Sequence, residues 1–85
     1  MTIYFMNLRD GTDELLDPDG REFESLDALR KAVLDTARDL MRGDMVDGLI
    51  DLRFRIDAED ADGVIVYTLP FKYAVSIIPE GSDYV

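Results

Sequence analysis

Residues 25–42, SLDALRKAVLDTARDLMR, are the longest periodic segment of the chain and constrain its fold more than any other stretch. Apolar side chains recur there at steps of three and four residues, which places them on one stripe of an α-helix. Ser25 suits the N-cap position and Gly43 suits the residue that ends a helix. The segment therefore predicts one amphipathic helix over residues 25–42, with an apolar stripe of Leu26, Leu29, Val33, Ala37 and Leu40.

Two short segments with strand character precede this helix. Residues 3–8 are aromatic and aliphatic, and residues 13–17 are expected to form a shorter second strand. Both faces of the first strand are largely apolar, which indicates a central position in a sheet. Residues 17–20, DPDG, have the composition of a turn, and Phe23 is expected to pack beneath the first turn of the helix. The first strand places Ile3 and Phe5 on one face and Tyr4, Met6 and Leu8 on the other.

Two more strands are predicted after the helix. Residues 49–57, LIDLRFRID, alternate between apolar and charged side chains, as expected for a strand with one buried face. Residues 58–63 form an acidic hairpin loop ending in Asp-Gly, and residues 64–69 return as the last strand. Residues 71–78 fit the spacing of a strand and that of a helical turn equally well, so both alternatives stay open.

This order of elements predicts an α+β fold of the type β-β-α-β-β. If the helix makes a right-handed crossover over the first strand, the sheet has the spatial order 2-1-3-4 and every neighbouring pair is antiparallel. The helix then packs across one face of the sheet. A chain of 85 residues is expected to form one domain, here residues 1–78, with a polar C-terminal tail over residues 79–85.

The composition excludes several classes of function. The chain has no cysteine and no histidine, which excludes disulfides, thiol nucleophiles, the usual zinc sites and imidazole general bases. The acidic segments around Gly20 and Gly63 do not place oxygen ligands at the spacing of a calcium-binding loop. We therefore predict a protein that is not an enzyme, with no catalytic residue, no cofactor and no metal site.

The charge and hydropathy of the chain bear on its partners. Nineteen acidic and nine basic residues give a net charge of −10, which repels both nucleic acid and anionic membranes. No apolar stretch approaches the ~20 residues needed to span a bilayer, and the first ten residues do not resemble a signal peptide. The sequence predicts a cytoplasmic protein that binds neither nucleic acid nor a membrane.

Several of these segments together carry a family resemblance. They are the aromatic pair Tyr4–Phe5, the turns at Asp10–Gly11 and at residues 17–20, the helix after Leu26-Asp27-Ala28, and the ending Leu69-Pro70-Phe71. In these features the chain resembles a family of small uncharacterised proteins, a domain of unknown function abundant in rhizobia and related alphaproteobacteria. The resemblance implies a fold pattern and a bacterial source, and it implies no catalytic residue.

The sheet face away from the helix is the candidate functional surface. If Ile50, Leu52, Phe54 and Ile56 meet the helix, the residues that alternate with them point to the other side. The expected cluster there consists of Arg53 and Arg55 with Tyr4, Met6 and Tyr67. Aromatic residues and arginine are enriched in protein interfaces. The alternative is a solvated face on which the two arginines neutralise Asp51 and Asp57.

The candidate surface and the acidity of the chain lead to three binding hypotheses. The main one is an interaction or accessory domain that self-associates, most simply as a homodimer, through this face or along an edge strand. The second is an acidic decoy that mimics nucleic acid and occupies the groove of a basic protein partner. The third is a module that holds a small anionic ligand with Arg53 or Arg55.

Overall fold

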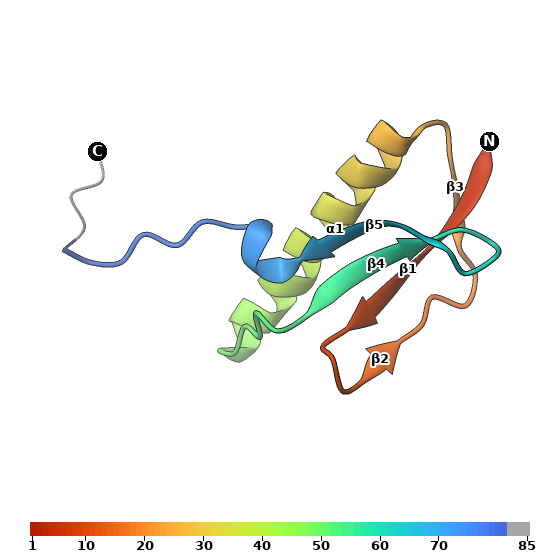
Figure 1. The fold of residues 1–85 in the computed structure, drawn as a ribbon. Helices are drawn as coiled ribbons and strands as arrows, with labels where there is room; N and C mark the ends of the chain where they lie inside the picture. The colour runs from red at the N-terminus through yellow and green to blue at the C-terminus, as the bar shows by residue number, and fades with distance from the viewer. Residues whose placement is uncertain (82–85) are drawn as a thin grey trace.

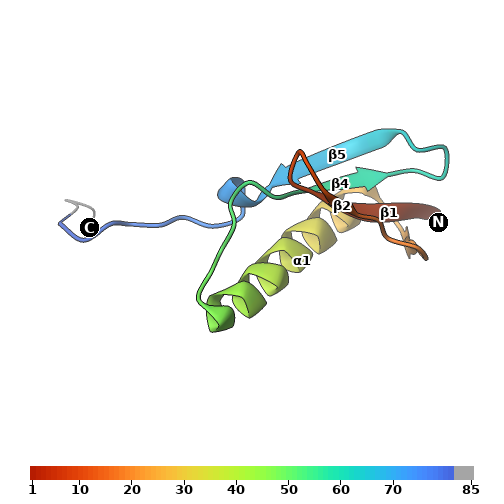
Figure 2. The same cartoon turned by 90° about the horizontal axis from the view of Figure 1, so that it is seen from below.

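A computed structural model describes residues 1–81 of the chain and shows an antiparallel sheet with one long helix across one face (Figure 1). Viewed from below, the helix lies on a single side of the sheet (Figure 2). The elements in chain order are β1 (Thr2–Arg9), β2 (Glu14–Leu15), β3 (Arg21–Phe23), α1 (Leu26–Asp47), β4 (Arg55–Glu59), β5 (Ile65–Pro70) and the 3₁₀ turn η1 (Phe71–Tyr73).

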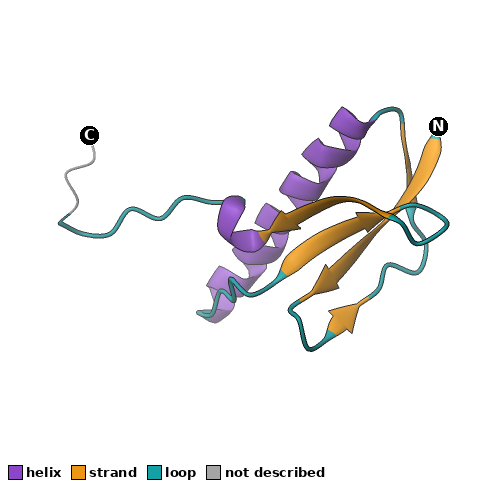
Figure 3. Ribbon diagram, viewed as in Figure 1, coloured by secondary structure: helices purple, strands orange, loops and turns teal. Residues whose placement is uncertain are grey.

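The sheet has the strand order β2-β1-β4-β5, and all of its paired strands are antiparallel (Figure 3). This arrangement confirms the predicted α+β class and the predicted order 2-1-3-4, with β4 and β5 as the third and fourth strands. The structure adds β3, which pairs with the start of β1 so that Thr2 lies opposite Phe23. The preceding Gly20 has φ +70°, and a Cβ atom there would lie 2.9 Å from the side chains of Ile3 and Phe5. Glycine therefore lets the chain turn closely under β1.

The helix is longer than the sequence predicts. It begins after Ser25, whose hydroxyl accepts a hydrogen bond from the backbone N–H of Ala28, as expected of an N-cap. It continues through Gly43 to Asp47, so the predicted end at Arg42–Gly43 is wrong. The helix ends instead at Gly48, which has φ +83° and donates its N–H to the carbonyls of Asp44 and Met45. A left-handed glycine cap of this kind ends a helix, whereas an isolated glycine inside one only weakens it.

The buried stripe of α1 follows a single row of residues spaced four apart, namely Leu29, Val33, Ala37 and Met41. These side chains meet Phe23, Ile56, Ala58, Leu69, Phe71 and Ala74 to form the core. The predicted stripe is right in its middle and wrong at its ends, because Leu26 and Leu40 are both exposed. Met41, which lies at the edge of the predicted stripe, fills the core in place of Leu40.

The predicted strand over residues 49–57 is wrong over its first half. Strand β4 begins only at Arg55, and residues 49–54 form turns and irregular backbone. The side chain of Asp51 accepts a hydrogen bond from the backbone N–H of Arg53 at 2.9 Å. An aspartate that folds back onto nearby backbone competes with strand pairing, so a perfect alternation of apolar and charged residues did not produce a strand here.

The segment after β5 resolves one open alternative. Residues 71–73 form a single 3₁₀ turn, in which Phe71 is buried and its N–H donates to the carbonyl of Phe54 at 2.9 Å. The helical turn is therefore confirmed for these three residues, and residues 74–78 form neither strand nor helix. Of the predicted tail over residues 79–85, residues 82–85 lie outside the described residues. No helix within residues 1–81 combines the length and the apolar composition needed to cross a bilayer.

Candidate interaction surface

The open face of the sheet, away from α1, carries a network of charged side chains centred on Arg9. The Arg9 guanidinium donates through Nε to Glu14 at 2.9 Å and through Nη1 to Asp57 at 2.8 Å. The same Nη1 also binds the carboxylate of Glu59. These partners come from β2 and β4, which flank β1, so one side chain at the end of the central strand ties three strands together.

Asp57 is the most buried member of this network, with a side chain only 1% exposed. It accepts hydrogen bonds from Arg9 and from the hydroxyl of Thr68, and the Nε of Arg55 lies 3.2 Å away. Burial raises the pKa of Asp57, but the hydrogen bonds and the charge of Arg55 outweigh it, so that the net pKa lies below its usual value. Asp57 is therefore ionised at neutral pH and depends on its two arginines.

Asn7, a buried polar side chain of β1, belongs to the same network through Glu59. Its amide nitrogen donates to Glu59 at 2.8 Å, and its amide oxygen accepts the backbone N–H of Asp17 at 2.9 Å. The hydrogen bonds from Asn7 and Arg9 lower the pKa of Glu59. Within the described part of the chain, every buried side-chain nitrogen and oxygen has a hydrogen-bond partner. The network is therefore saturated, which is typical of a structural role.

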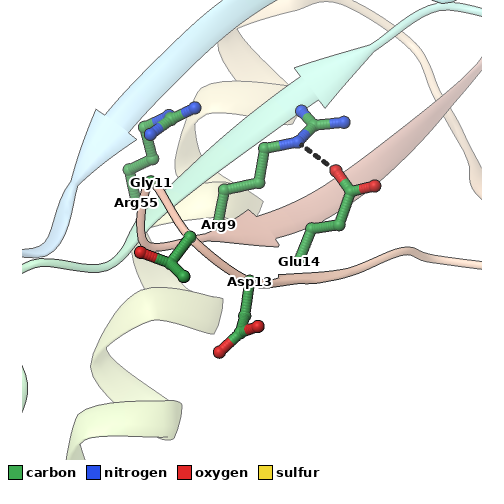
Figure 4. Close-up of a pocket in the computed structure, with 6 residues that line it drawn as sticks. Arg9, Gly11, Asp13, Glu14 and Arg55 are labelled. Atoms are coloured by element: carbon green, nitrogen blue, oxygen red, sulfur yellow. Dashed lines mark hydrogen bonds and ion pairs between the residues drawn. The ribbon is translucent and has the colours of Figure 1, made fainter.

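A cavity of about 220 Å³ lies beside this network at the turn between β1 and β2. Figure 4 shows Arg9 and Arg55 projecting from neighbouring strands, with Glu14, Asp13 and the turn at Gly11 around them. Both arginines are already paired with carboxylates. Two acidic side chains also line the cavity, so it offers little free positive charge to the anionic ligand that the third hypothesis requires.

The structure separates the five residues of the predicted interface. Tyr4, Met6 and Tyr67 are partly buried and pack against the core beneath the sheet, on the side of the helix. Arg55 lies on the opposite, open face, where its side chain is 39% exposed. Arg53 lies outside the sheet in the segment before β4 and pairs with Asp51 at 2.8 Å, which lowers the pKa of Asp51 to about 2.

This separation has a clear cause. Residues 3–6 of β1 are apolar on both faces, so they do not show which face meets the helix. Met6 lies opposite Ala58 and Leu8 opposite Ile56, and because Ala58 and Ile56 belong to the core, Tyr4 and Met6 lie on the helix side. The predicted cluster therefore does not form. The two arginines do pair with Asp51 and Asp57, as the solvated-face alternative expects.

The outer edge of β5 is a second candidate interaction surface. Two observations show which residues of β5 hydrogen-bond to β4. The Phe71 N–H donates to the Phe54 carbonyl, and Leu69 lies opposite Ile56 in the register. In an antiparallel pair of strands, hydrogen-bonded residues alternate with residues whose backbone N–H and C=O point away from the partner strand. The N–H and C=O of Thr68 therefore face away from β4, and within residues 1–81 no strand pairs with β5 on that side.

Aliphatic side chains accompany this free edge. Val64, Ile65 and Val66 are 57%, 51% and 37% exposed, and β5 itself carries no charged residue. Natural edge strands are usually protected by charges, prolines or bulges. Here a bulge near Glu59 and Pro70 at the far end protect only the two ends of the strand.

The sequence interpretation missed Arg9 as a feature of this surface. The first strand was predicted over residues 3–8, whereas Arg9 is the last residue of β1, and its partners Asp57 and Glu59 lie 48 and 50 residues away. The predicted order 2-1-3-4 already places residues 64–69 at an edge of the sheet, and the run VIVYTL has no charged residue in a chain of net charge −10.

Comparison with known proteins places most of the chain in one family. A family model described as a domain of unknown function, DUF6894, matches residues 3–72. No curated protein and no solved structure matched the chain.

Proposed function

The chain belongs to the DUF6894 family, and on that premise we propose that it is a non-enzymatic interaction domain that self-associates through the free edge of β5. Two copies pair their β5 strands antiparallel about a twofold axis, which joins their sheets into one continuous sheet. A twofold interface uses the same patch on both copies, so a single self-complementary strand is sufficient to form it. A bacterial source and a cytoplasmic location, inferred from the sequence, belong to this proposal.

The proposal rests on one observation: the backbone groups on the outer side of β5 have no partner strand within residues 1–81, and exposed aliphatic side chains lie beside them. An outward N–H and C=O at Thr68 can each find a partner in the same strand of a second copy. Burial of Val64, Ile65 and Val66 adds a hydrophobic contribution, since each is at least one-third exposed in the single chain.

Charge also favours this edge over the rest of the surface. Two copies with a net charge of −10 each repel one another. Because β5 has no acidic residue, two paired β5 strands bring no acidic side chains of their own together. Lys72 is the only basic residue after Arg55. In an antiparallel pairing centred on Tyr67, Lys72 of one copy comes near Asp62 of the second copy, and the twofold axis repeats this contact.

Sedimentation velocity over a series of protein concentrations tests the proposal. The wild-type chain is expected to form dimers whose fraction rises with concentration and with salt, because salt screens the repulsion between two acidic copies. Val66→Lys is expected to remain monomeric, since lysine on an edge strand opposes strand pairing. Val46→Lys is the matched control, because Val46 is 84% exposed at the far end of α1, and it should dimerise like the wild type.

Two outcomes would contradict the proposal. One is a wild-type chain that stays monomeric at every concentration and salt level. The other is a Val66→Lys variant that dimerises as well as the Val46→Lys control, which would place any interface elsewhere.

The acidic decoy and the anion-binding module remain predictions. Salt-sensitive binding of the monomer to a basic protein would favour the decoy. Stabilisation of the fold by an added anion would favour the binding module.

A further inference from the structure

An apolar groove lies at the C-terminal end of α1, away from the sheet edge discussed above. It is bounded by the helix, by residues 49–54 and by residues 74–78, and it encloses about 370 Å³. Its apolar walls are Met41, Met45, Ile50, Leu52, Val75 and Ile77. None of its lining residues belongs to β5, so it is independent of the proposed dimer contact. Its outer wall also lies beyond residue 72, where the family match ends.

The groove has a buried floor and open walls. Met41 is 3% exposed and belongs to the core, whereas Met45 and Ile77 are 66% and 72% exposed. Exposing these apolar side chains to water costs free energy, which a bound apolar group would recover. Volumes of roughly 300–1,000 Å³ are typical of sites for small ligands. Methionine side chains adapt readily to the shape of an apolar ligand. The volume and the apolar lining of the groove therefore suit an aliphatic group.

Two arginines lie at the rim of this groove. Arg38 and Arg42 line it from successive turns of α1, on the same helix face as Met41 and Met45. Arg38 donates through Nε to the carbonyl of Ala74 at 2.9 Å, which fixes its guanidinium beside the groove. Within residues 1–81, Arg42 pairs only with Asp39, at 3.3 Å between exposed side chains. The rim therefore holds two cations, in a chain with more than twice as many acidic as basic residues.

We propose that this groove binds an unbranched aliphatic carboxylate. The hydrocarbon chain lies along Met41, Met45 and Leu52, and the carboxylate is held between the guanidinium groups of Arg38 and Arg42. Like charges four residues apart on a helix repel each other. An anion between them removes this repulsion and accepts charge-assisted hydrogen bonds, which are the stronger kind.

The test is a titration of the ¹⁵N-labelled chain with dodecanoate below its micelle concentration, followed by NMR. Saturable shifts are expected at Met41, Met45, Leu52 and Ile77. Dodecyltrimethylammonium has a similar chain length and the opposite charge, and it is expected to bind far more weakly. Arg42→Gln should lower the affinity for dodecanoate by about tenfold, because a charge-assisted hydrogen bond is lost.

Arg30→Gln is the matched control, since Arg30 is an exposed arginine of α1 that pairs with the aspartate three residues before it, as Arg42 does, and it lies outside the groove. It should bind dodecanoate like the wild type. Equal binding of the cationic probe, shifts that do not saturate, or equal affinity in the Arg42→Gln variant would each overturn the proposal. The Val66→Lys variant should keep full dodecanoate binding, so the result is separable from the fate of the proposed dimer.

Discussion

Replacing Arg9 by leucine tests whether the charged network on the open face stabilises the fold. The substitution removes the shared partner of Glu14, Asp57 and Glu59. Asp57 has a side chain only 1% exposed, so the groups around its carboxylate, Arg9 among them, stand in place of water. The expected result is a large loss of stability from a residue that contributes nothing to the apolar core.

The magnitude follows from the geometry. Removing one partner of a buried ion pair costs roughly 3–5 kcal/mol. Arg55 remains 3.2 Å from Asp57 in the variant and retains part of the compensation. We therefore expect the lower end of that range, about 3 kcal/mol. A domain of this size has a total stability on the order of 4–13 kcal/mol, so the variant is expected to keep only part of it.

Urea unfolding followed by circular dichroism measures this loss. With a slope of roughly 1–3 kcal/mol per molar urea, the midpoint should fall by at least about 1 M. Arg53→Leu makes the same substitution at a surface ion pair and should lower the midpoint far less, because exposed pairs contribute little. Equal midpoints for the two variants would refute the view that Asp57 depends on Arg9.

Further predictions concern the helix and the response to acid. Gly43→Ala should stabilise the fold by about 0.5–1 kcal/mol in urea unfolding, because Gly43 is helical and its Cβ has open space. Gly48→Ala should destabilise it by about 1 kcal/mol, because its φ of +83° strains an alanine. Ser25→Ala should cost about 1 kcal/mol by removing the N-cap hydrogen bond. Unfolding measured against pH should show constant stability near neutrality, since the chain has no histidine. Because the folded pKa values of Asp57 and Glu59 are lowered, the stability they provide is present above the unfolded values of about 4 and is lost as pH falls below them.

The sequence predicts the arrangement of the fold better than the limits of its elements. The amphipathic period of α1 and the short segments around it were sufficient for the α+β class and for the strand order. The end of α1 was misplaced because Gly43 and Gly48 look alike in the sequence, and only the backbone shows which one has a positive φ. The start of β4 was misplaced because Asp51 captures the backbone N–H of Arg53.

The candidate surface was harder to predict because it depends on long-range pairing. Tyr4 and Met6 alternate with Ile3 and Phe5, and both sets are apolar enough to face the helix. The contact of Arg9 with Asp57 joins residues that are 48 positions apart, so a pattern of neighbouring residues in the sequence does not predict it. The edge position of β5, in contrast, was predicted, because the strand order 2-1-3-4 places the last strand outermost.

Amide hydrogen exchange at Thr68, measured at low and high protein concentration, tests the proposed self-association most directly. The Thr68 N–H faces the free edge of β5, while those of Tyr67 and Leu69 face β4 and serve as internal controls. We predict that Thr68 exchanges rapidly in the dilute monomer and becomes protected as concentration rises, with the two controls protected throughout. Rapid exchange of Thr68 at every concentration, in a sample that sedimentation shows to be dimeric, would contradict pairing through this edge.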